Sequence, residues 1–192
     1  KIASDIALDI REQGRAKRDS NNKIIRDDKG VIIKVPGTLK NVKAVGWYID
    51  EYKQAQVSMN LINYKKTSMH EAFVEVCNQA AKRGLRVTGS EIVGLVPKNA
   101  ILDSGKYFLK KQNASIAIPE KDIISNAIQS LGLNDLSVFD RDKTIIEEAL
   151  NLTKKSFKDF SMSEFIDEVS RSTPTPGGGS VSALAGTLSA SL

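Results

Sequence analysis

Two neighbouring stretches of the chain alternate between apolar and polar side chains, the period of a β-strand with one buried face. They cover residues 43–49 and 55–62, and the polar residues 50–54 join them. The second stretch places apolar Val57, Met59 and Leu61 on one face; the opposite face is an uncharged polar row, formed by Gln56, Ser58 and Asn60. The pattern predicts an antiparallel hairpin with one face toward a core.

Apolar residues spaced three and four positions apart predict helices on both sides of this hairpin. We expect them at 2–15, 68–83, 97–111, 121–131 and 142–152. Residues 85–96, which contain Gly89 and Gly94, are expected to form a third strand. A hairpin followed by a helix and a further strand gives a βαβ crossover, and it predicts an α+β sandwich with helices over one sheet face.

The composition changes after about residue 152, which places a domain boundary there. We expect a first domain at 1–152, a linker at 153–161 and the start of an all-helical domain at 162–192. The chain begins and stops within helical patterns, and we expect it to be a fragment of a longer polypeptide. No internal repeat is expected along it.

Composition narrows the possible classes of protein. The 192 residues are 41% apolar and 27% charged, which is typical of a folded globular chain. Because no apolar run is long enough to span a bilayer, no membrane association is expected. A single cysteine, Cys77, fits a reducing compartment such as the cytoplasm, and with a single histidine it makes a zinc site of the Cys/His kind implausible.

The polar row of the second strand is the first candidate site. Gln56, Ser58 and Asn60 suit a polar heterocycle better than a charged surface would. Glu91, on the expected third strand, offers a general base or a substrate contact. The alternatives are a solvated sheet face and a surface carboxylate.

Residues 15–43 hold more Lys and Arg than Asp and Glu. They also contain two short apolar runs, at 23–26 and 31–34, which predict a hairpin arm. This arm is either a solvated loop or, as the alternative function, the contact surface of a nucleic-acid-binding module.

The second candidate site is glycine-rich and begins a helix. Gly177, Gly178, Gly179 and Ser180 can turn backbone N–H groups toward an anion or another ligand, although no lysine of the phosphate-loop pattern follows. The alternatives are a flexible linker and close helix packing, since small residues recur at every fourth position after it. An oligomerisation scaffold built on this helix remains a third function.

For His70 and for the pair Arg11 and Arg15, a structural role is favoured over a functional one. The only histidine, His70, lies in the first turn of a helix, where a structural role is favoured over a catalytic one. Arg11 and Arg15 are four residues apart and can bind carboxylates, although local ion pairs on an exposed helix face are favoured.

Four blocks of sequence, in order, resemble the glutamate formiminotransferase family. They are the segments 6–15 (IALDIREQGR), 45–48 (VGWY), 55–61 (AQVSMNL) and 89–97 (GSEIVGLVP). Residues 163–192, with the Pro-Gly-Gly-Gly-Ser segment, are similar to the start of a formiminotetrahydrofolate cyclodeaminase domain. Together they resemble the bifunctional formiminotransferase-cyclodeaminase family of histidine degradation.

The resemblance implies a ferredoxin-like subdomain at 1–152, with the polar row of the second strand facing a folate cleft. It implies tetrahydrofolate, possibly polyglutamylated, and formiminoglutamate as substrates, a homo-oligomer, no metal and no nucleic acid. The family's catalytic histidine and the cyclodeaminase carboxylate lie in parts that this chain lacks. We therefore expect no catalytic residue among residues 1–192, and no activity from them alone.

Overall fold

The computed structural model describes residues 1–150, 159–171 and 176–192. It has an α+β fold, as predicted, with two small antiparallel sheets. The chain divides into two compact units, Lys1–Ile146 and Glu147–Leu192, which we describe separately. The elements, in chain order, are α1 Ile2–Ile10, β1 Arg15–Ala16, β2 Lys34–Val35, β3 Val42–Ile49, β4 Gln54–Leu61, α2 Met69–Ala81, α3 Lys98–Lys111, α4 Glu120–Leu131, α5 Arg141–Thr144, α6 Ile146–Ala149, α7 Met162–Ser170 and α8 Gly178–Ala190.

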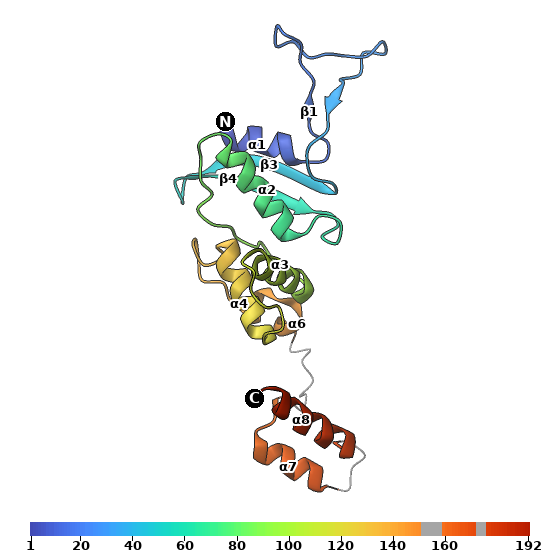
Figure 1. Ribbon diagram of the computed structural model, residues 1–192. Coiled ribbons are helices and arrows are strands. Elements are labelled where there is room, and N and C mark those ends of the chain that lie inside the picture. Colours follow the sequence, from blue (N-terminus) through green and yellow to red (C-terminus); the bar gives the residue numbers. More distant parts are fainter. Residues whose placement is uncertain (151–158, 172–175) are drawn as a thin grey trace. The chain divides into compact units, whose positions relative to one another are not determined.

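The predicted hairpin is confirmed as β3 and β4, eight residues each, paired from Val42 opposite Leu61 to Ile49 opposite Gln54. Helices α1 and α2 cover one face of it (Figure 1), and their apolar side chains form one buried cluster with the sheet. Gly46 is required at the contact, since a β-carbon there would collide with the backbone of Ala3. The alternating pattern predicts the covered face of β4, and the glycine sets how closely α1 approaches. In β3 the apolar Val45 and Trp47 are instead 51% and 53% exposed, because Val42 and Ala44 are the side chains that face the helices.

A second apolar cluster holds the rest of the first unit. Helices α3 and α4 cross at Gly105, where a β-carbon would collide with the backbone of Ile123. Their buried residues include Ile101, Ile124 and Ala127, each with no exposed surface. Gly132 ends α4 in the left-handed conformation, φ 63°, as a C-terminal glycine should.

The predicted third strand is wrong. Residues 85–95 belong to no strand, and Gly94 within them has a φ of 86°. At the end of this segment Val96 makes a single parallel bridge with Ile145. The physical reason is the lack of a partner: no backbone hydrogen bond joins this segment to β4, whereas Ser90 N–H donates to Gly132 O. The expected βαβ crossover is therefore not formed by the described residues.

Two helix boundaries also differ from expectation. The opening helix ends at Ile10 rather than near residue 15, since Arg11 is extended and Gly14 has a φ of 65°. The helix expected at 142–152 is two short helices, α5 and α6, separated by fully buried Ile145 in an extended conformation. Residues 151 and 152 lie outside the described residues.

An arm formed by residues 15–35 projects beyond the hairpin's helices (Figure 1). The two predicted runs pair as expected: Arg26 bridges Ile32, and Ile33 N–H donates to Ile25 O at 3.0 Å. A second small hairpin precedes this one, because Ile25 N–H donates to Lys17 O at 2.9 Å. Lys17 N–H in turn donates to Ile33 O, so three residues spaced eight apart close a ring of backbone hydrogen bonds.

The ring reflects an eight-residue repeat, contrary to the expectation of none. Residues 18–25 (RDSNNKII) and 26–33 (RDDKGVII) share the pattern Arg-Asp-x-x-x-x-Ile-Ile. In each copy the aspartate, Asp19 or Asp27, accepts two backbone N–H groups of its own turn. The fifth residue has positive φ in both copies, 65° at Asn22 and 77° at Gly30. Local hydrogen bonds therefore shape the arm.

The second unit contains α7 and α8. Ser161 begins α7 with a capping box, in which its hydroxyl accepts from Glu164 N–H and Glu164 accepts from Ser161 N–H. Phe165 is the buried residue of this helix. Most of the predicted linker, residues 153–158, lies outside the described residues.

Candidate functional site

The uncharged polar row of β4 lies on the sheet face opposite the helices. The register pairs Trp47 with Gln56 and Val45 with Ser58, so two side chains of β3 share this face with the row. Trp47 is 53% exposed, which leaves one surface of its indole open to solvent. The sheet therefore presents a flat aromatic ring beside hydrogen-bonding groups.

A hydrogen-bonded relay joins three residues across this face. Trp47 Nε1 donates to Gln56 Oε1 at 2.8 Å, and Gln56 Nε2 donates to Glu91 Oε1 at 2.7 Å. Glu91 comes from the extended segment after α2, 35 positions along the chain from Gln56. The relay fixes the orientation of the Gln56 amide and holds the carboxylate of Glu91 at the sheet.

The other two residues of the row, Ser58 and Asn60, have side chains without a hydrogen-bonding partner among the described residues. Asn60 is exposed beside its partner Lys43. These groups can donate to and accept from a ligand without breaking an existing bond. The four predicted residues of the strand site, Gln56, Ser58, Asn60 and Glu91, thus share one surface, although only Gln56 and Glu91 touch.

Trp47 and Lys43 belong to this surface but were not predicted as site residues. Cross-strand pairing is the signal that could have found them, since an antiparallel register places Trp47 opposite Gln56 and Lys43 opposite Asn60. Together the face offers an aromatic ring, amides, a hydroxyl, a carboxylate and a cation. That set is suited to a flat heterocycle with several polar edges, bound by stacking and by hydrogen bonds.

The glycine-rich candidate is placed at the start of α8. Gly177 is the N-cap, and its carbonyl accepts from Ser180 N–H at 2.9 Å. A β-carbon at Gly178 or Gly179 would meet open space. The position suits an anion, since the first N–H groups of a helix have no partner within the helix.

His70 packs between α2 and α3 and lies outside the strand site. Its ring stacks on Tyr107 at 4.4 Å, and its Nε2 and Nδ1 lie 3.0 and 3.3 Å from the hydroxyls of Ser68 and Ser104. Burial lowers the pKa of His70, although the nearby acidic residues Glu71 and Asp103 act in the opposite direction. A ring held by hydroxyls and an aromatic neighbour fits the structural role favoured by the sequence.

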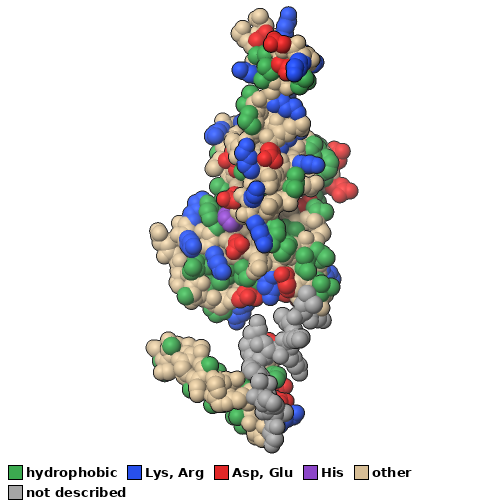
Figure 2. Space-filling view, turned by 90° about the vertical axis from the view of Figure 1, so that its right-hand side faces the viewer, with side chains coloured by type: hydrophobic (Ala, Val, Ile, Leu, Met, Phe, Trp, Pro, Cys, Tyr) green, Lys and Arg blue, Asp and Glu red, His purple; other side chains and the backbone are tan. Residues whose placement is uncertain are grey.

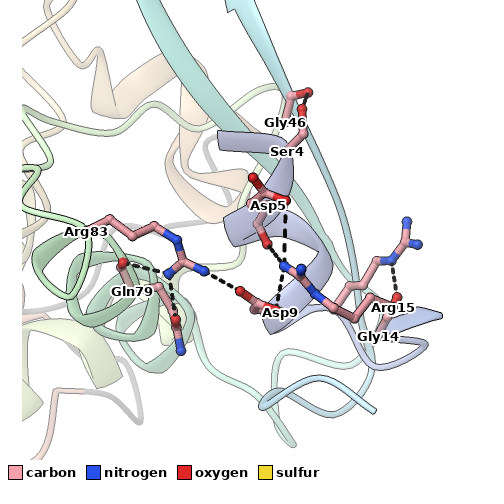
Figure 3. Close-up of polar contacts among 9 residues, drawn as sticks. Ser4, Asp5, Asp9, Gly14, Arg15, Gly46, Gln79 and Arg83 are labelled. Atoms are coloured by element: carbon pink, nitrogen blue, oxygen red, sulfur yellow. Dashed lines mark hydrogen bonds and ion pairs between the residues drawn. The ribbon is translucent and has the colours of Figure 1, made fainter. Parts of the chain in front are cut away.

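The arginines of the opening segment are used within the fold (Figure 3). Arg15 Nη2 lies 2.6 Å from Asp9 Oδ1 and donates to Asp5 O at 2.8 Å. Asp9 Oδ2 also pairs with Arg83 from beyond α2. Arg11 donates to Gly14 O at 3.0 Å. These arginines therefore form ion pairs and hydrogen bonds that fasten the base of the arm to α1 and α2.

Charged groups elsewhere do not gather into one site. On the face in Figure 2, Lys and Arg side chains lie among Asp and Glu, including at the tip of the arm. Arg18 and Arg26 donate to carbonyls of their own turns, at 2.6 and 2.8 Å. Across the described ranges, no three His, Cys, Asp or Glu side chains are placed to hold a metal ion, and none of the helices is long and apolar enough to cross a membrane.

Comparison with known proteins now gives the family. Residues 1–151 match the family described as formiminotransferase domain, and residues 161–192 match formiminotransferase-cyclodeaminase. A formimidoyltransferase-cyclodeaminase of Dictyostelium discoideum is 41% identical over 99% of the chain, and one of Gallus gallus is 37% identical over all of it. A glutamate formimidoyltransferase of Thermoplasma acidophilum is 38% identical over 47% of the chain and 30% of its own length.

The chain spans about a third of the length of the two formimidoyltransferase-cyclodeaminases, 33% and 32%. The match over residues 1–151 includes the hairpin, the extended segment with Glu91 and the arm. The chain therefore belongs to the formiminotransferase domain family.

Proposed function

We propose that this chain is part of a bifunctional, folate-dependent enzyme of histidine degradation. The transferase moves a formimino group from N-formimino-L-glutamate to N5 of tetrahydrofolate and releases glutamate. The cyclodeaminase then closes 5-formiminotetrahydrofolate to 5,10-methenyltetrahydrofolate and releases ammonia. One observation carries the proposal: a single chain matches the formiminotransferase domain over 1–151 and formiminotransferase-cyclodeaminase over 161–192.

The strand face is our candidate folate surface in the transferase. The indole of Trp47 would stack on the ring system of folate, while Ser58 and Asn60 would hydrogen-bond its polar edge. Glu91, held by Gln56 at 2.7 Å, would accept a hydrogen bond from the amino group of that ring. Lys43 and the other cations nearby would attract the glutamate tail, including a polyglutamate tail.

The glycine-rich start of α8 would contact an anionic part of the substrate in the cyclodeaminase. Gly177, Gly178, Gly179 and Ser180 begin the helix, and the open space beside Gly178 and Gly179 supports close approach of a ligand to the backbone. We assign the domains as 1–152 and 162–192, with 153–161 as linker. We assign catalytic residues to parts of the enzyme outside residues 1–192, so that these residues alone have no turnover.

We further propose a ferredoxin-like sheet for the transferase part. The succession α1, β3, β4 and α2, with both helices on one sheet face, supports it. We also propose that the enzyme is a cytoplasmic homo-oligomer that uses no metal. The single cysteine is in keeping with a reducing compartment. The nucleic-acid alternative finds no support in the comparisons, and Arg18 and Arg26 already donate to the backbone of the arm.

The test uses the full-length enzyme with formiminoglutamate and tetrahydrofolate. Methenyltetrahydrofolate absorbance and ammonia are followed together. Both products are expected; glutamate without ammonia would leave the transferase alone, and neither product would overturn the proposal. A salt-dependent shift of DNA or RNA with the same protein would then favour the arm as a nucleic-acid surface.

Variants of the strand face test where folate binds. Gln56→Leu removes both bonds of the relay, and Asn60→Leu removes a free amide; each is expected to lower kcat/KM for tetrahydrofolate roughly tenfold. Ser125→Ala, on the exposed side of α4, is the matched control and should leave kcat/KM unchanged. If kcat/KM for tetrahydrofolate is unchanged in both site variants, the strand face is not the folate-binding surface.

A further inference from the structure

A cavity separate from the strand site lies beside α2. It has a volume of about 390 Å³ and is bounded by residues 38–40, which follow the arm, by residues 66–67, and by one side of α2 with Tyr107 of α3. None of the described residues that line it belongs to the strand site. Small-molecule sites have volumes of roughly 300–1,000 Å³, so the cavity is large enough to admit a small ligand.

Two lysines that line this cavity carry charges without an internal partner. Lys40 follows the arm, and Lys66 precedes α2. Both side chains are exposed, and their ammonium groups make no ion pair or hydrogen bond with the described residues. An anionic group that enters the cavity would therefore meet two cations that no carboxylate of the described chain neutralises.

Two carboxylates line the same cavity from α2. Glu71 and Glu75 are four residues apart, so they lie on one face of the helix. Like charges at this spacing destabilise a helix, and neither carboxylate pairs with a cation among the described residues. A cation bound between the two carboxylates would offset this repulsion.

Each carboxylate is oriented by one of its oxygens and keeps the other free. Glu71 Oε2 accepts from the backbone N–H and from the hydroxyl of Ser68, both at 2.8 Å. Glu75 Oε1 accepts from Thr38 at 2.9 Å and from Gln79 at 2.8 Å. Glu71 Oε1 and Glu75 Oε2 make no hydrogen bond with the described residues. Because the carboxylates are held in place before a ligand arrives, little ordering is needed when it binds.

The other side chains around the cavity are apolar or neutral. Leu39 and Val74 are aliphatic, and Tyr107 contributes a ring that stacks on His70 at 4.4 Å. The amide of Asn78 and the hydroxyl of Tyr107 make no hydrogen bond with the described residues. Such a surface fits a short aliphatic chain that ends in a polar group.

We propose that this cavity binds a free α-amino acid with a polar side chain. The ammonium group of the ligand would lie at the free oxygens of Glu71 and Glu75, and its carboxylate would lie at Lys40 and Lys66. Its side chain would pass along the aliphatic wall and end at the amide of Asn78, which can both donate and accept.

The balance of charge favours an amino acid over a simple anion or a simple cation. Two lysines and two glutamates give these four side chains no net charge, which matches a ligand with one charge of each sign. An anion without an ammonium group would be repelled by the two carboxylates, and an amine without a carboxylate would be repelled by the two lysines. The binding does not depend on the proposed transferase or cyclodeaminase activity.

Equilibrium dialysis of the full-length enzyme with radiolabelled L-glutamine tests the proposal. Free glutamine is the probe because it has a polar side chain and is neither a substrate nor a product of the proposed reactions. We expect saturable binding, and roughly tenfold or weaker binding of glutaramate, which lacks the ammonium, and of γ-aminobutyramide, which lacks the carboxylate. Absence of glutamine binding would overturn the proposal, and so would equal binding of glutaramate, since that would indicate a simple anion site.

Two neighbouring lysines provide a matched pair of variants. Lys66→Ala removes a cation of the cavity, whereas Lys65→Ala removes an exposed cation that does not line it. The dissociation constant of L-glutamine should rise roughly tenfold or more in the first variant and stay unchanged in the second. Because both side chains are exposed, neither variant loses buried packing. Equal affinities in the two variants would overturn the location of the site.

Glu75→Gln tests the ammonium end of the site. The substitution keeps an oxygen that can accept from Thr38 and Gln79 but removes the negative charge. In the full-length enzyme, added L-glutamine should raise the melting temperature of the wild type and of the control Glu51→Gln, an exposed carboxylate outside the cavity. The increase should be lost in Glu75→Gln. An equal increase in both variants would overturn the assignment of the ammonium group.

Discussion

The arm and the helix-covered hairpin are both built on short antiparallel pairs, but different forces hold them. In the hairpin, Ile10 of α1 is fully buried with Ala44 and Val76 from elements distant along the chain. In the arm, Val31 is 60% exposed, and the bonds that define the turns join residues two to four positions apart. Burial fixes the hairpin, whereas local polar bonds fix the arm.

The difference teaches where stability and tolerance to change should lie. Apolar burial contributes in proportion to the area removed from water, and a small arm removes little. Turn-forming aspartates and positive-φ residues can specify a shape without contributing much to global stability. We therefore expect substitutions in the arm to act locally and substitutions under the sheet to act on the whole unit.

The largest contrast should come from removing one isoleucine side chain in each region. Ile10→Ala leaves a cavity under the sheet and should lower the free energy of unfolding by about 2–5 kcal/mol. Ile33→Ala, at a side chain 38% exposed, should cost roughly 1 kcal/mol or less. Urea denaturation of both variants measures the difference, and equal losses would contradict the distinction between the regions.

Asp9 pairs with Arg15 and Arg83 and so forms a clamp at the base of the arm; removing this clamp should have an intermediate effect on stability. Asp9→Ala leaves Arg15 and Arg83 without their shared carboxylate and should cost roughly 1–2 kcal/mol, since the group is only partly screened by water. Asp5→Ala is the control, because its carboxylate lies 3.8 Å from Arg15 and is 41% exposed. If the two variants melt alike, the clamp contributes no more than a surface ion pair.

Within the arm, neighbouring aspartates offer a matched pair. Asp27→Ala removes the acceptor of two backbone N–H groups and should loosen the second turn by about 1 kcal/mol. Asp28→Ala, one position on, removes a carboxylate with no hydrogen bond to the described residues. Faster exchange at Ile33 in the first variant alone, with an unchanged melting temperature in both, is expected; a large global loss from Asp27→Ala would show that the arm is part of the core.

The smallest effect concerns pH and His70. Burial lowers its pKa from the usual 6.5, so the unfolded chain binds this proton more readily than the folded one. Stability is therefore greatest above about pH 6.5 and decreases as the pH falls below that value. His70→Gln should weaken the decrease between pH 7.5 and 5.5, while Glu71 stays ionised because its pKa is lowered by bonds from Ser68. An identical pH profile in the variant would exclude His70 as the source.

Patterns confined to a few residues predicted much of the local structure. The alternation over 55–62 predicted the buried face of β4, and Ser68 begins α2 with a capping box that includes Glu71. The repeat in the arm is also present in the sequence, but it is hard to recognise there because its recurring Arg-Asp and Ile-Ile pairs are separated by dissimilar turns. Local chemistry is enough for such features, since donor and acceptor lie within one turn.

The site needed more than the strand pattern. Gln56, Ser58 and Asn60 share a face because of the period of a strand, and this could be predicted. The bond from Gln56 to Glu91 could not, since it depends on how α2 returns the chain to the sheet 35 positions later. The role of Trp47 follows from the register, which the turn at 50–53 and the core together decide.

Sequence patterns alone were enough to predict the hairpin, the end of α4 at Gly132 and the family to which the chain belongs, whereas they left the start of α2 open between Thr67 and Ser68. Two features depended on tertiary contacts: residues 85–95 stay outside the sheet, and Ile145 interrupts a helix to fill the core. The physical reason is the range of the interactions. Caps and alternation act over a few residues, whereas an extended segment becomes a strand only when a second backbone lies beside it.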